Sequence, residues 1–126
     1  MFSLFTKKED TPAFNWNNII DQAELNDIIS SSAFSRTPIL FFKHSSRCGI
    51  SRMVLSRFER QNTELSKDIS CYLINVLDQR DLSNFLTAQY NIIHESPQLL
   101  LISGESCLAN ASHNQILNLT LSEFSL

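Results

Sequence analysis

The sequence predicts an α/β domain in which helices cover both faces of a mixed sheet. Two observations lead to this prediction. Short apolar runs typical of buried strands alternate with amphipathic helical patterns, and the last two strand-like runs are joined only by a short turn. A strand–helix–strand order makes its two strands parallel neighbours, whereas a tight turn makes its two strands antiparallel. With 126 residues, the chain has the length of one domain.

The first predicted helix begins near Asp21. Asp21 and Glu24 have the spacing of a capping box, and an aliphatic stripe follows them: Leu25, Ile28 and Ile29. We expect the three serines at positions 30–32 to end this helix. Residues 1–11 precede it as a stretch interrupted by polar residues, which we expect to form a loose N-terminal arm.

A βαβ unit follows the first helix. The apolar run 38–43 predicts a buried strand, and the β-prone run 71–77 predicts another. We expect Ile39–Phe42 and Leu73–Val76 to be adjacent parallel strands, because unalternating apolar strands are typical of buried parallel sheets. A second helix should begin between them at about Gly49. Its predicted apolar face contains Ile50, Met53, Val54 and Phe58.

The second half of the chain predicts a third helix, a hairpin and a helical tail. Asp78 should cap the third helix. The apolar residues of that helix are Leu82, Phe85, Leu86 and Tyr90. Pro97 should open a strand over residues 98–102, and a turn should connect it to a return strand over residues 107–111. We expect the tail from His113 onward to be helical.

The composition excludes several classes of protein. Ten basic and thirteen acidic side chains give a net charge of −3, which excludes a basic nucleic-acid footprint over the whole chain. The apolar runs are far shorter than the roughly 20 residues that span a bilayer, so we expect no membrane segment. Three cysteines, an odd number, and an N-terminus without the pattern of a secretory signal predict a cytoplasmic protein with free thiols.

The segment that most indicates chemistry is Lys43–Arg52, which joins a predicted strand to a predicted helix. Cys48 stands where the helix N-terminus directs its unpaired N–H groups and the positive end of its dipole, and both favour thiolate over thiol. No Asp or Glu occurs from residue 43 to residue 58, whereas four cations do: Lys43, Arg47, Arg52 and Arg57. The sequence therefore predicts a reactive thiol at Cys48 rather than one that only packs at a helix start.

The residue three positions after Cys48 determines the type of redox site. A dithiol redox helix has its second cysteine there, and this chain has Ser51. Because no internal disulfide can form at this site, a mixed disulfide on Cys48 needs an outside thiol to resolve it. Ser51 either hydrogen-bonds the Cys48 sulfur or satisfies backbone groups of the first helical turn. We expect Cys71 to be a buried, inert thiol and Cys107 to be a plain strand residue, with a second redox site as the alternative for Cys107.

Cysteines and histidines give no sign of a metal site. No pair of them has the spacing of zinc ligands, so we expect no structural metal. The histidines, His44, His94 and His113, are widely scattered in the sequence. We interpret each of them as a hydrogen-bonding loop residue rather than a ligand or a base.

Several segments resemble motifs of a known family. Phe42–Ser51 reads Phe-Lys-His-Ser-Ser-Arg-Cys-Gly-Ile-Ser. It resembles the active-site segment of the YtxJ-type proteins, the monothiol bacilliredoxins, which usually reads Lys-His-Ser-Thr-Arg-Cys-Pro-Ile-Ser. His94–Gln98 and Ala111–His113 resemble later motifs of that family. The resemblance runs from about Trp16 to Ile116 and implies a thioredoxin-like fold.

The resemblance also implies an activity and roles for particular residues. The family is implicated in removing bacillithiol, a low-molecular-weight thiol, from S-thiolated proteins. By resemblance, Cys48 is the attacking nucleophile. Its supporting neighbours are Lys43, His44, Ser46, Arg47, Gly49 and Ser51. Glu95, Ser96 and Pro97 correspond to the loop that docks the disulfide substrate, and the Ser96–Pro97 bond is expected to be cis and close to Cys48.

Two residues depart from the family pattern, and one of them suggests a rival function. Ser46 replaces a Thr, and Gly49 replaces a Pro. With Gly49, the segment Cys48–Ser51 differs by one residue from the Cys-Gly-Phe-Ser signature of monothiol glutaredoxins, which hold an iron–sulfur cluster between subunits with glutathione. The chain lacks the later Gly-Gly pair and the Thr-Val-Pro form of the glutaredoxins. A third interpretation is a thioredoxin-like binding module without turnover.

From the residues and the resemblance together, we expect one thioredoxin-like domain over residues 1–126 that acts as a thiol–disulfide oxidoreductase under oxidative stress. We expect no bound cofactor and no metal, with bacillithiol or a similar small thiol as co-substrate. The expected partners are S-thiolated proteins. We expect a cytoplasmic monomer that binds neither nucleic acid nor membranes.

Overall fold

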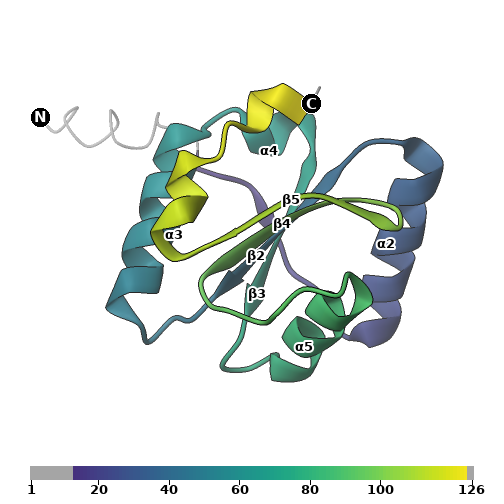
Figure 1. The fold of residues 1–126 in the computed structure, drawn as a ribbon, viewed down its shortest axis with the longest axis horizontal. Coiled ribbons are helices and arrows are strands. Elements are labelled where there is room, and N and C mark those ends of the chain that lie inside the picture. The colour runs from purple at the N-terminus through teal and green to yellow at the C-terminus, as the bar shows by residue number, and fades with distance from the viewer. Residues whose placement is uncertain (1–12, 125–126) are drawn as a thin grey trace, which may run out of the picture.

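A central five-stranded sheet organises the protein, with helices on both of its faces (Figure 1). The computed structural model describes residues 13–124. Its elements, in chain order, are β1 (Trp16–Asn17), α2 (Gln22–Ser35), β2 (Ile39–His44), α3 (Gly49–Gln61), α4 (Leu65–Asp68), β3 (Ser70–Asn75), α5 (Arg80–Gln89), β4 (Gln98–Ser103), β5 (Ser106–Ser112), and the 3-10 helices η1 (His113–Asn118) and η2 (Leu121–Phe124).

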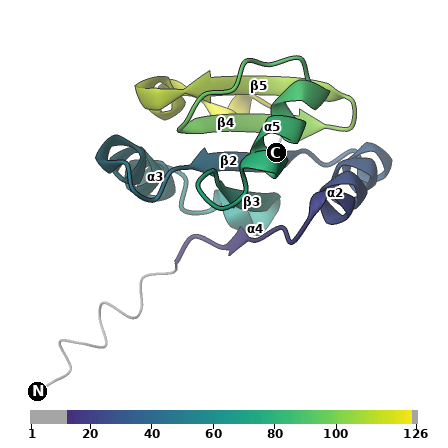
Figure 2. The same cartoon turned by 90° about the horizontal axis from the view of Figure 1, so that it is seen from below.

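The strands lie in the order β1-β3-β2-β4-β5, and Figure 2 shows β5, β4, β2 and β3 side by side. β2 pairs in parallel with β3, β1 pairs in parallel with β3, and the pairs β2–β4 and β4–β5 are antiparallel. The predicted parallel pair and the predicted final hairpin are therefore confirmed. The strand predicted over residues 71–77 ends earlier than expected: β3 stops at Asn75, and Val76 lies in the turn that follows.

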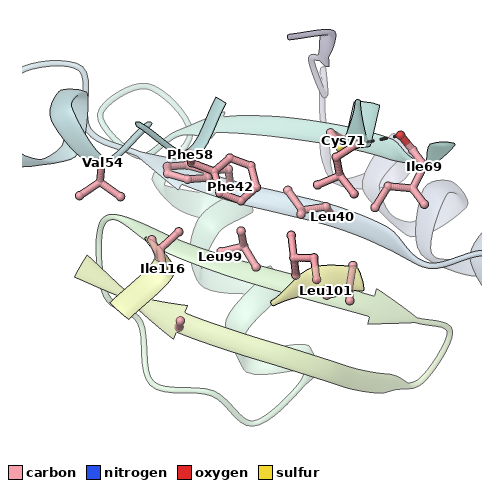
Figure 3. Packing of buried hydrophobic residues seen from close by; sticks show 12 residues of the cluster. Leu40, Phe42, Val54, Phe58, Ile69, Cys71, Leu99, Leu101 and Ile116 are labelled. Carbon is pink, nitrogen blue, oxygen red and sulfur yellow. Dashed lines mark hydrogen bonds between the residues drawn. The ribbon is translucent and has the colours of Figure 1, made fainter. Parts of the chain in front are cut away.

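The sheet separates two apolar clusters. Successive residues of a strand point to opposite faces, so β2 contributes to both clusters. Leu40 and Phe42 belong to the cluster under α3, which also contains Val54, Phe58, Leu99, Leu101 and Ile116 (Figure 3). Ile39 and Phe41 belong to the cluster under α2 and α5, which also contains Leu25, Leu82, Leu86, Leu100 and Ile102. Figure 1 shows α3 on one side of the strands and α2 and α5 on the other, as predicted.

Two elements were not predicted from the sequence: the two-residue strand β1 and the one-turn helix α4. β1 is held at the sheet edge by its tryptophan. The indole Nε1–H of Trp16 donates to the carboxylate of Glu59 at 2.7 Å, and its ring packs edge-on against Phe42. A strand this short has no periodicity that a sequence pattern can reveal.

The first helix begins where predicted but ends later. Asp21 is the N-cap of α2, and its carboxylate accepts a hydrogen bond from the N–H of Glu24 at 2.9 Å. The prediction that the serines at 30–32 end the helix is wrong. The Ser32 hydroxyl is buried and accepts a hydrogen bond from the N–H of Gly104 at 2.9 Å, so tertiary packing satisfies a side chain that otherwise disfavours a helix.

The predicted cap of the third helix is wrong. α5 has Gln79, not Asp78, as its N-cap. Asp78 lies in the turn after β3, where its carboxylate accepts a hydrogen bond from the side-chain amide of Asn75 at 3.3 Å. The N–H groups of Asp78 and Gln79 both donate to the Asn75 carbonyl, so this turn is completed before the helix starts.

The predicted apolar face of α3 is only partly correct. Val54 and Phe58 are buried, but Ile50 is 56% exposed and Met53 is 37% exposed. The buried stripe begins instead at Ser51, one turn before Val54. Because Ser51 is polar, a pattern of apolar residues does not include it, and the buried face of the helix is therefore predicted at the wrong rotation.

The tail is helical, as predicted, but it consists of the two short 3-10 helices η1 and η2 rather than one α-helix. The predicted loose arm over residues 1–11 lies outside the described residues. Within residues 13–124, none of the helices has both the length and the apolar character to cross a bilayer.

Candidate active site

Cys48 lies just beyond the carboxyl end of β2, at the start of α3. It is the N-cap residue of this helix, with an extended backbone (φ −97°, ψ 122°), and its carbonyl accepts the first helical hydrogen bond from the N–H of Arg52 at 3.0 Å. Its side chain is partly exposed. The sequence predicted this position, where the N–H groups of the first helical turn favour an anion.

Ser51 occupies the position of a resolving cysteine and is fully buried. Its hydroxyl oxygen accepts a hydrogen bond from the N–H of Ser45 at 3.0 Å and lies 2.8 Å from Nδ1 of His44. Neither role that the sequence left open matches these contacts, because the hydroxyl binds the loop N–H of Ser45 and the ring of His44 rather than the Cys48 sulfur or the first turn of α3. Burial, followed by the charge of Arg52, lowers the pKa of His44 below its usual value of 6.5, so His44 is neutral at pH 7.

The loop between β2 and α3 is fixed from both sides. The Ser46 carbonyl accepts a hydrogen bond from Nη1 of Arg52 at 3.0 Å, and the Ser46 hydroxyl accepts one from the amide of Asn75 at 3.2 Å. Arg47 and Arg52 are exposed. In the described part of the chain, the only ion pair joins Lys67 to Glu64, so neither arginine is paired with a carboxylate.

Lys43 is fully buried and points away from α3. Because β2 alternates its side chains, His44 reaches Ser51 on the α3 face, whereas Lys43 lies on the α5 face. Its ammonium group lies 2.6 Å from Nδ1 of His94 and donates to Oε1 of Gln98 at 2.9 Å. Burial, then the charge of Arg80, lowers the pKa of Lys43 to about 7, against a smaller opposite effect of Glu95. The sequence grouped Lys43 with the cations around Cys48, but its side chain lies in the interior.

The predicted docking segment lies at the same end of the sheet as Cys48. The Ser96–Pro97 bond is cis, as predicted. Lys43 pairs with Gln98 in the antiparallel register of β2 and β4, so Pro97 adjoins the end of β2 from which the Cys48 loop starts. Pro97 is buried, Glu95 is exposed, and the Ser96 hydroxyl oxygen is buried with no hydrogen-bond partner among the described residues.

Some residues at this end of the sheet were not predicted to belong to the site. Asn75 binds the Cys48 loop, Gln98 binds Lys43, and the charge of Arg80 acts on Lys43. His94 was interpreted only as a hydrogen-bonding loop residue, and its contact with Lys43 confirms that interpretation. The sequence marks Lys43 and Gln98 only as polar residues that adjoin the apolar runs of their strands, and it does not show that they meet.

The other two cysteines lie in less reactive surroundings. Cys71 is fully buried in the cluster under α3 (Figure 3), and burial raises its pKa to about 12. Cys107 is half-buried in β5, and burial raises its pKa as well, against hydrogen bonds with Asn110 and Ala109. The predicted burial of Cys71 and the predicted strand position of Cys107 are confirmed.

Two cavities of the described residues lie away from Cys48, one between α2 and the start of β2 and one between α4 and η2. Across residues 13–124, no three or more His, Cys, Asp or Glu side chains gather into a group that could hold a metal ion. Cys48 itself is partly exposed, and two exposed arginines, Arg47 and Arg52, lie on the loop and helix that flank it in the chain.

The fold is shared with thioredoxins. Thioredoxin O2 from Arabidopsis thaliana superimposes with a TM-score of 0.67 at 20% identity, over 90% of this chain and 95% of that chain. Thioredoxin O1 from the same plant has a TM-score of 0.64 at 17% identity, over 86% and 95%. A further protein described as having a thioredoxin fold has a TM-score of 0.67 at 24% identity, over 86% and 88%. The predicted thioredoxin-like fold is confirmed.

The thioredoxin fold, with a partly exposed cysteine at the start of α3, agrees with the class that the sequence predicts, the thiol–disulfide oxidoreductases. Within this class, residues 17–121 match the family model described as monothiol bacilliredoxin BrxC. The chain therefore belongs to the monothiol bacilliredoxin family, and it is a thiol–disulfide oxidoreductase. Of the three interpretations of the sequence, family membership favours the first.

Proposed function

We propose that the protein removes bacillithiol, or a similar small thiol, from S-thiolated proteins, and that Cys48 is the attacking nucleophile. The observation that carries this proposal is the contrast among the three cysteines. Cys48 is partly exposed at the start of α3, whereas burial raises the pKa of both Cys71 and Cys107. The thiolate is the attacking form in disulfide exchange, so these surroundings favour Cys48.

The proposed reaction transfers the small thiol. The Cys48 thiolate attacks the sulfur of the small thiol in the mixed disulfide, forming a new S–S bond while the bond to the target breaks. The target cysteine leaves as a thiolate and takes a proton from water, so the target is reduced and Cys48 carries the small thiol. An outside thiol then attacks the adduct and restores Cys48, because Ser51 has no sulfur with which to do so.

The remaining predicted residues have supporting roles in this proposal. Six of them form the strand end, loop and helix start that surround Cys48 in the chain: Lys43, His44, Ser46, Arg47, Gly49 and Ser51. The cations Arg47 and Arg52 favour the negatively charged sulfurs of the exchange. Glu95, Ser96 and Pro97 would dock the target beside its disulfide, and their position next to the end of β2 supports this role.

The proposal assigns no resident cofactor. The small thiol is a co-substrate, and S-thiolated proteins are the partners. We also propose that the protein works as a monomer in the cytoplasm, where thiols are kept reduced.

A transfer assay with single substitutions tests the proposal. The target is a protein whose cysteine carries bacillithiol, and the measured quantity is the rate at which the target is reduced. Cys48→Ala should abolish transfer. Cys71→Ala, the matched control, should leave the rate unchanged once its fold has been checked by circular dichroism. A Cys48→Ala variant that still reduces the target would contradict the proposal.

Ser51→Cys tests the monothiol character separately. This variant should release the small thiol without added reductant, because the introduced thiol can then attack the adduct on Cys48. The wild-type adduct should persist until a thiol is added. Wild-type protein that resolves its own adduct would contradict the monothiol scheme and implicate Cys107. Visible absorbance after purification without oxygen would instead support an iron–sulfur cluster carrier.

A further inference from the structure

A buried polar cluster joins β2 to the segment that precedes Pro97. The cluster consists of Lys43, Ser83, His94 and Gln98. The Lys43 ammonium group lies 2.6 Å from Nδ1 of His94 and 2.9 Å from Oε1 of Gln98. The hydroxyl of Ser83, on α5, lies 3.3 Å from the same His94 nitrogen. Lys43, Ser83 and Gln98 are buried, and His94 is partly exposed. The cluster thus connects β2, α5 and β4 to the segment at residue 94.

Gln98 extends the cluster along the segment. Its Nε2 donates to the carbonyl of Ile93 at 2.9 Å, and its Oε1 accepts a hydrogen bond from the N–H of Glu95 at 3.2 Å. His94 lies between these two residues in the chain, and its ring contacts Lys43 and Ser83. Residues 93–95 are therefore fixed by four contacts, and the side chains of His94 and Gln98 both contact the ammonium group of Lys43.

The identity of the residue at position 43 needs an explanation. A buried lysine without a carboxylate partner is unfavourable for stability, and neither of the two groups that bind this lysine is a carboxylate. The four preceding residues of β2 are all apolar and buried, so an apolar residue at position 43 would continue the strand. A residue that opposes folding in this way is a candidate for a role in activity.

We propose that Lys43 is a positioning residue for thiol–disulfide exchange, and that it holds residues 93–97 in the shape that docks a target protein, acting through His94 and Gln98. The inference rests on the docking role proposed above for Glu95–Pro97. Lys43 does not touch the reacting sulfurs in this scheme. Its effect is on how well a protein substrate binds and not on the reactivity of Cys48.

The contact between Lys43 and His94 requires a neutral imidazole. Burial, then the charges of Lys43 and Arg80, lowers the pKa of His94 below its usual value, and Glu95 opposes this effect. The charged or titratable groups that act on the pair are therefore Arg80 from α5 and Glu95 from the segment itself, while Ser83 and Gln98 are uncharged. When acid protonates His94, two cations face each other at 2.6 Å and the segment is released from β2.

The test compares two substrates at a range of pH values. One substrate is an S-thiolated protein, which needs docking, and the other is the small disulfide dithiodipyridine, which does not. Lys43→Met should lower kcat/KM for the protein by about tenfold or more, mainly through KM, because a charge-assisted contact is lost. Its rate with the small disulfide should stay unchanged. Lys67→Met, which removes an exposed lysine on α4, is the matched control and should change neither rate.

Two substitutions of His94 separate positioning from simple loss of packing. His94→Asn keeps a hydrogen-bond acceptor but cannot be protonated, whereas His94→Ala keeps neither property. The ratio of the protein rate to the small-disulfide rate should fall in wild type as the pH drops from about 7 to about 5. It should stay level in His94→Asn and be low at every pH in His94→Ala. Using the ratio removes any effect of pH that is common to both substrates.

Amide hydrogen exchange of residues 93–95 distinguishes failure of this inference from failure of the proposed function. Exchange should be faster in Lys43→Met than in wild type or Lys67→Met. If wild type reduces only the small disulfide, but residues 93–95 still exchange faster in Lys43→Met than in wild type, the proposed function fails. The inference that Lys43 positions the segment then still stands. If Lys43→Met exchanges like wild type, or lowers both substrate rates equally, the inference is overturned. The same holds if His94→Asn follows the wild-type pH profile.

Discussion

Cys48 and Cys71 belong to the same βαβ unit, but their surroundings are opposite. Cys71 lies within β3, fully buried in the apolar cluster under α3, and burial raises its pKa to about 12. Cys48 lies past the end of the neighbouring strand, partly exposed, at a helix N-terminus. Burial disfavours the thiolate, and a helix N-terminus favours it. Placement along the strand–loop–helix unit therefore gives the two thiols opposite surroundings, and on this contrast rests the proposal that Cys48 is the one that reacts.

Alkylation gives the largest expected difference between the two cysteines. In single-cysteine variants at neutral pH, Cys48 should react fastest with iodoacetamide. Cys71 should react more slowly than a free thiol by about three orders of magnitude, because its pKa of about 12 compares with about 8.5 for free cysteine. Rates measured by mass spectrometry check this. Faster alkylation of Cys71 or Cys107 than of Cys48 would contradict the assignment of the site.

A second effect extends the comparison from a buried thiol to a buried amine. The pKa of Lys43 is about 7 in the folded protein and 10.5 as its unperturbed value, so the unfolded chain binds more protons between these pH values. Lys43 therefore makes the protein more stable as the pH rises through this range. The free energy of unfolding of wild type, minus that of Lys43→Met, should increase from pH 7 to pH 9 by up to about 1.4 kcal/mol per pH unit.

Urea titrations at pH 6, 7, 8 and 9 measure this difference. Cys71 and Tyr90, whose pKa values burial raises to about 12, are present in both proteins, so their effects cancel. If the difference in the free energy of unfolding between wild type and Lys43→Met does not change with pH, Lys43 keeps its normal pKa. In that case Lys43 would stay charged over this pH range, and only His94 could make the polar cluster sensitive to pH.

The sequence predicted the parts of the fold that carry strong local signals. Apolar runs located β2 and β3, Pro97 marked the start of β4, and the helix that follows Cys48 begins at Gly49 as expected. The parts it missed depend on tertiary contacts. Ser32 stays in a helix because its hydroxyl binds the backbone of Gly104, which is 72 positions away.

The candidate site divides in the same way. Cys48, Ser51 and Pro97 were found because they belong to motifs that can be read within ten residues. The contact of Lys43 with Gln98 spans 55 positions, and no local pattern reveals it. The alternation of β2 determined that Lys43 points into the interior while His44 faces Ser51. Which of the two alternating sets of β2 side chains faces α3 could be determined only once the elements that pack against the strand were known.

The smallest predicted effect concerns the residue next to Cys48. Gly49 is the first residue of α3. Proline is common at this position, because a backbone N–H there has no partner within the helix and proline lacks an N–H. Cys48 already has the extended backbone that a residue before proline adopts, and a Cβ on Gly49 would meet its nearest neighbour, Nη2 of Arg52, at an ordinary 3.8 Å. Gly49→Pro should therefore raise the free energy of unfolding by about 0.4–1 kcal/mol.

Urea unfolding of Gly49→Pro measures this gain, with Gly49→Ala as the control that adds a side chain without fixing the backbone. The alkylation rate of Cys48 should remain close to that of wild type in both variants. A loss of stability in Gly49→Pro would show that the first turn of α3 does not have the backbone conformation described above.

The central claim is that Cys48 receives the small thiol, and locating the adduct tests it most directly. Wild-type protein is mixed with a bacillithiol-carrying target in the absence of other thiols, digested without reduction and analysed by peptide mass spectrometry. The account predicts a single bacillithiol adduct, located on the peptide that contains Cys48, together with a reduced target. An adduct on Cys71 or Cys107, or a reduced target with no adduct on Cys48, would contradict it.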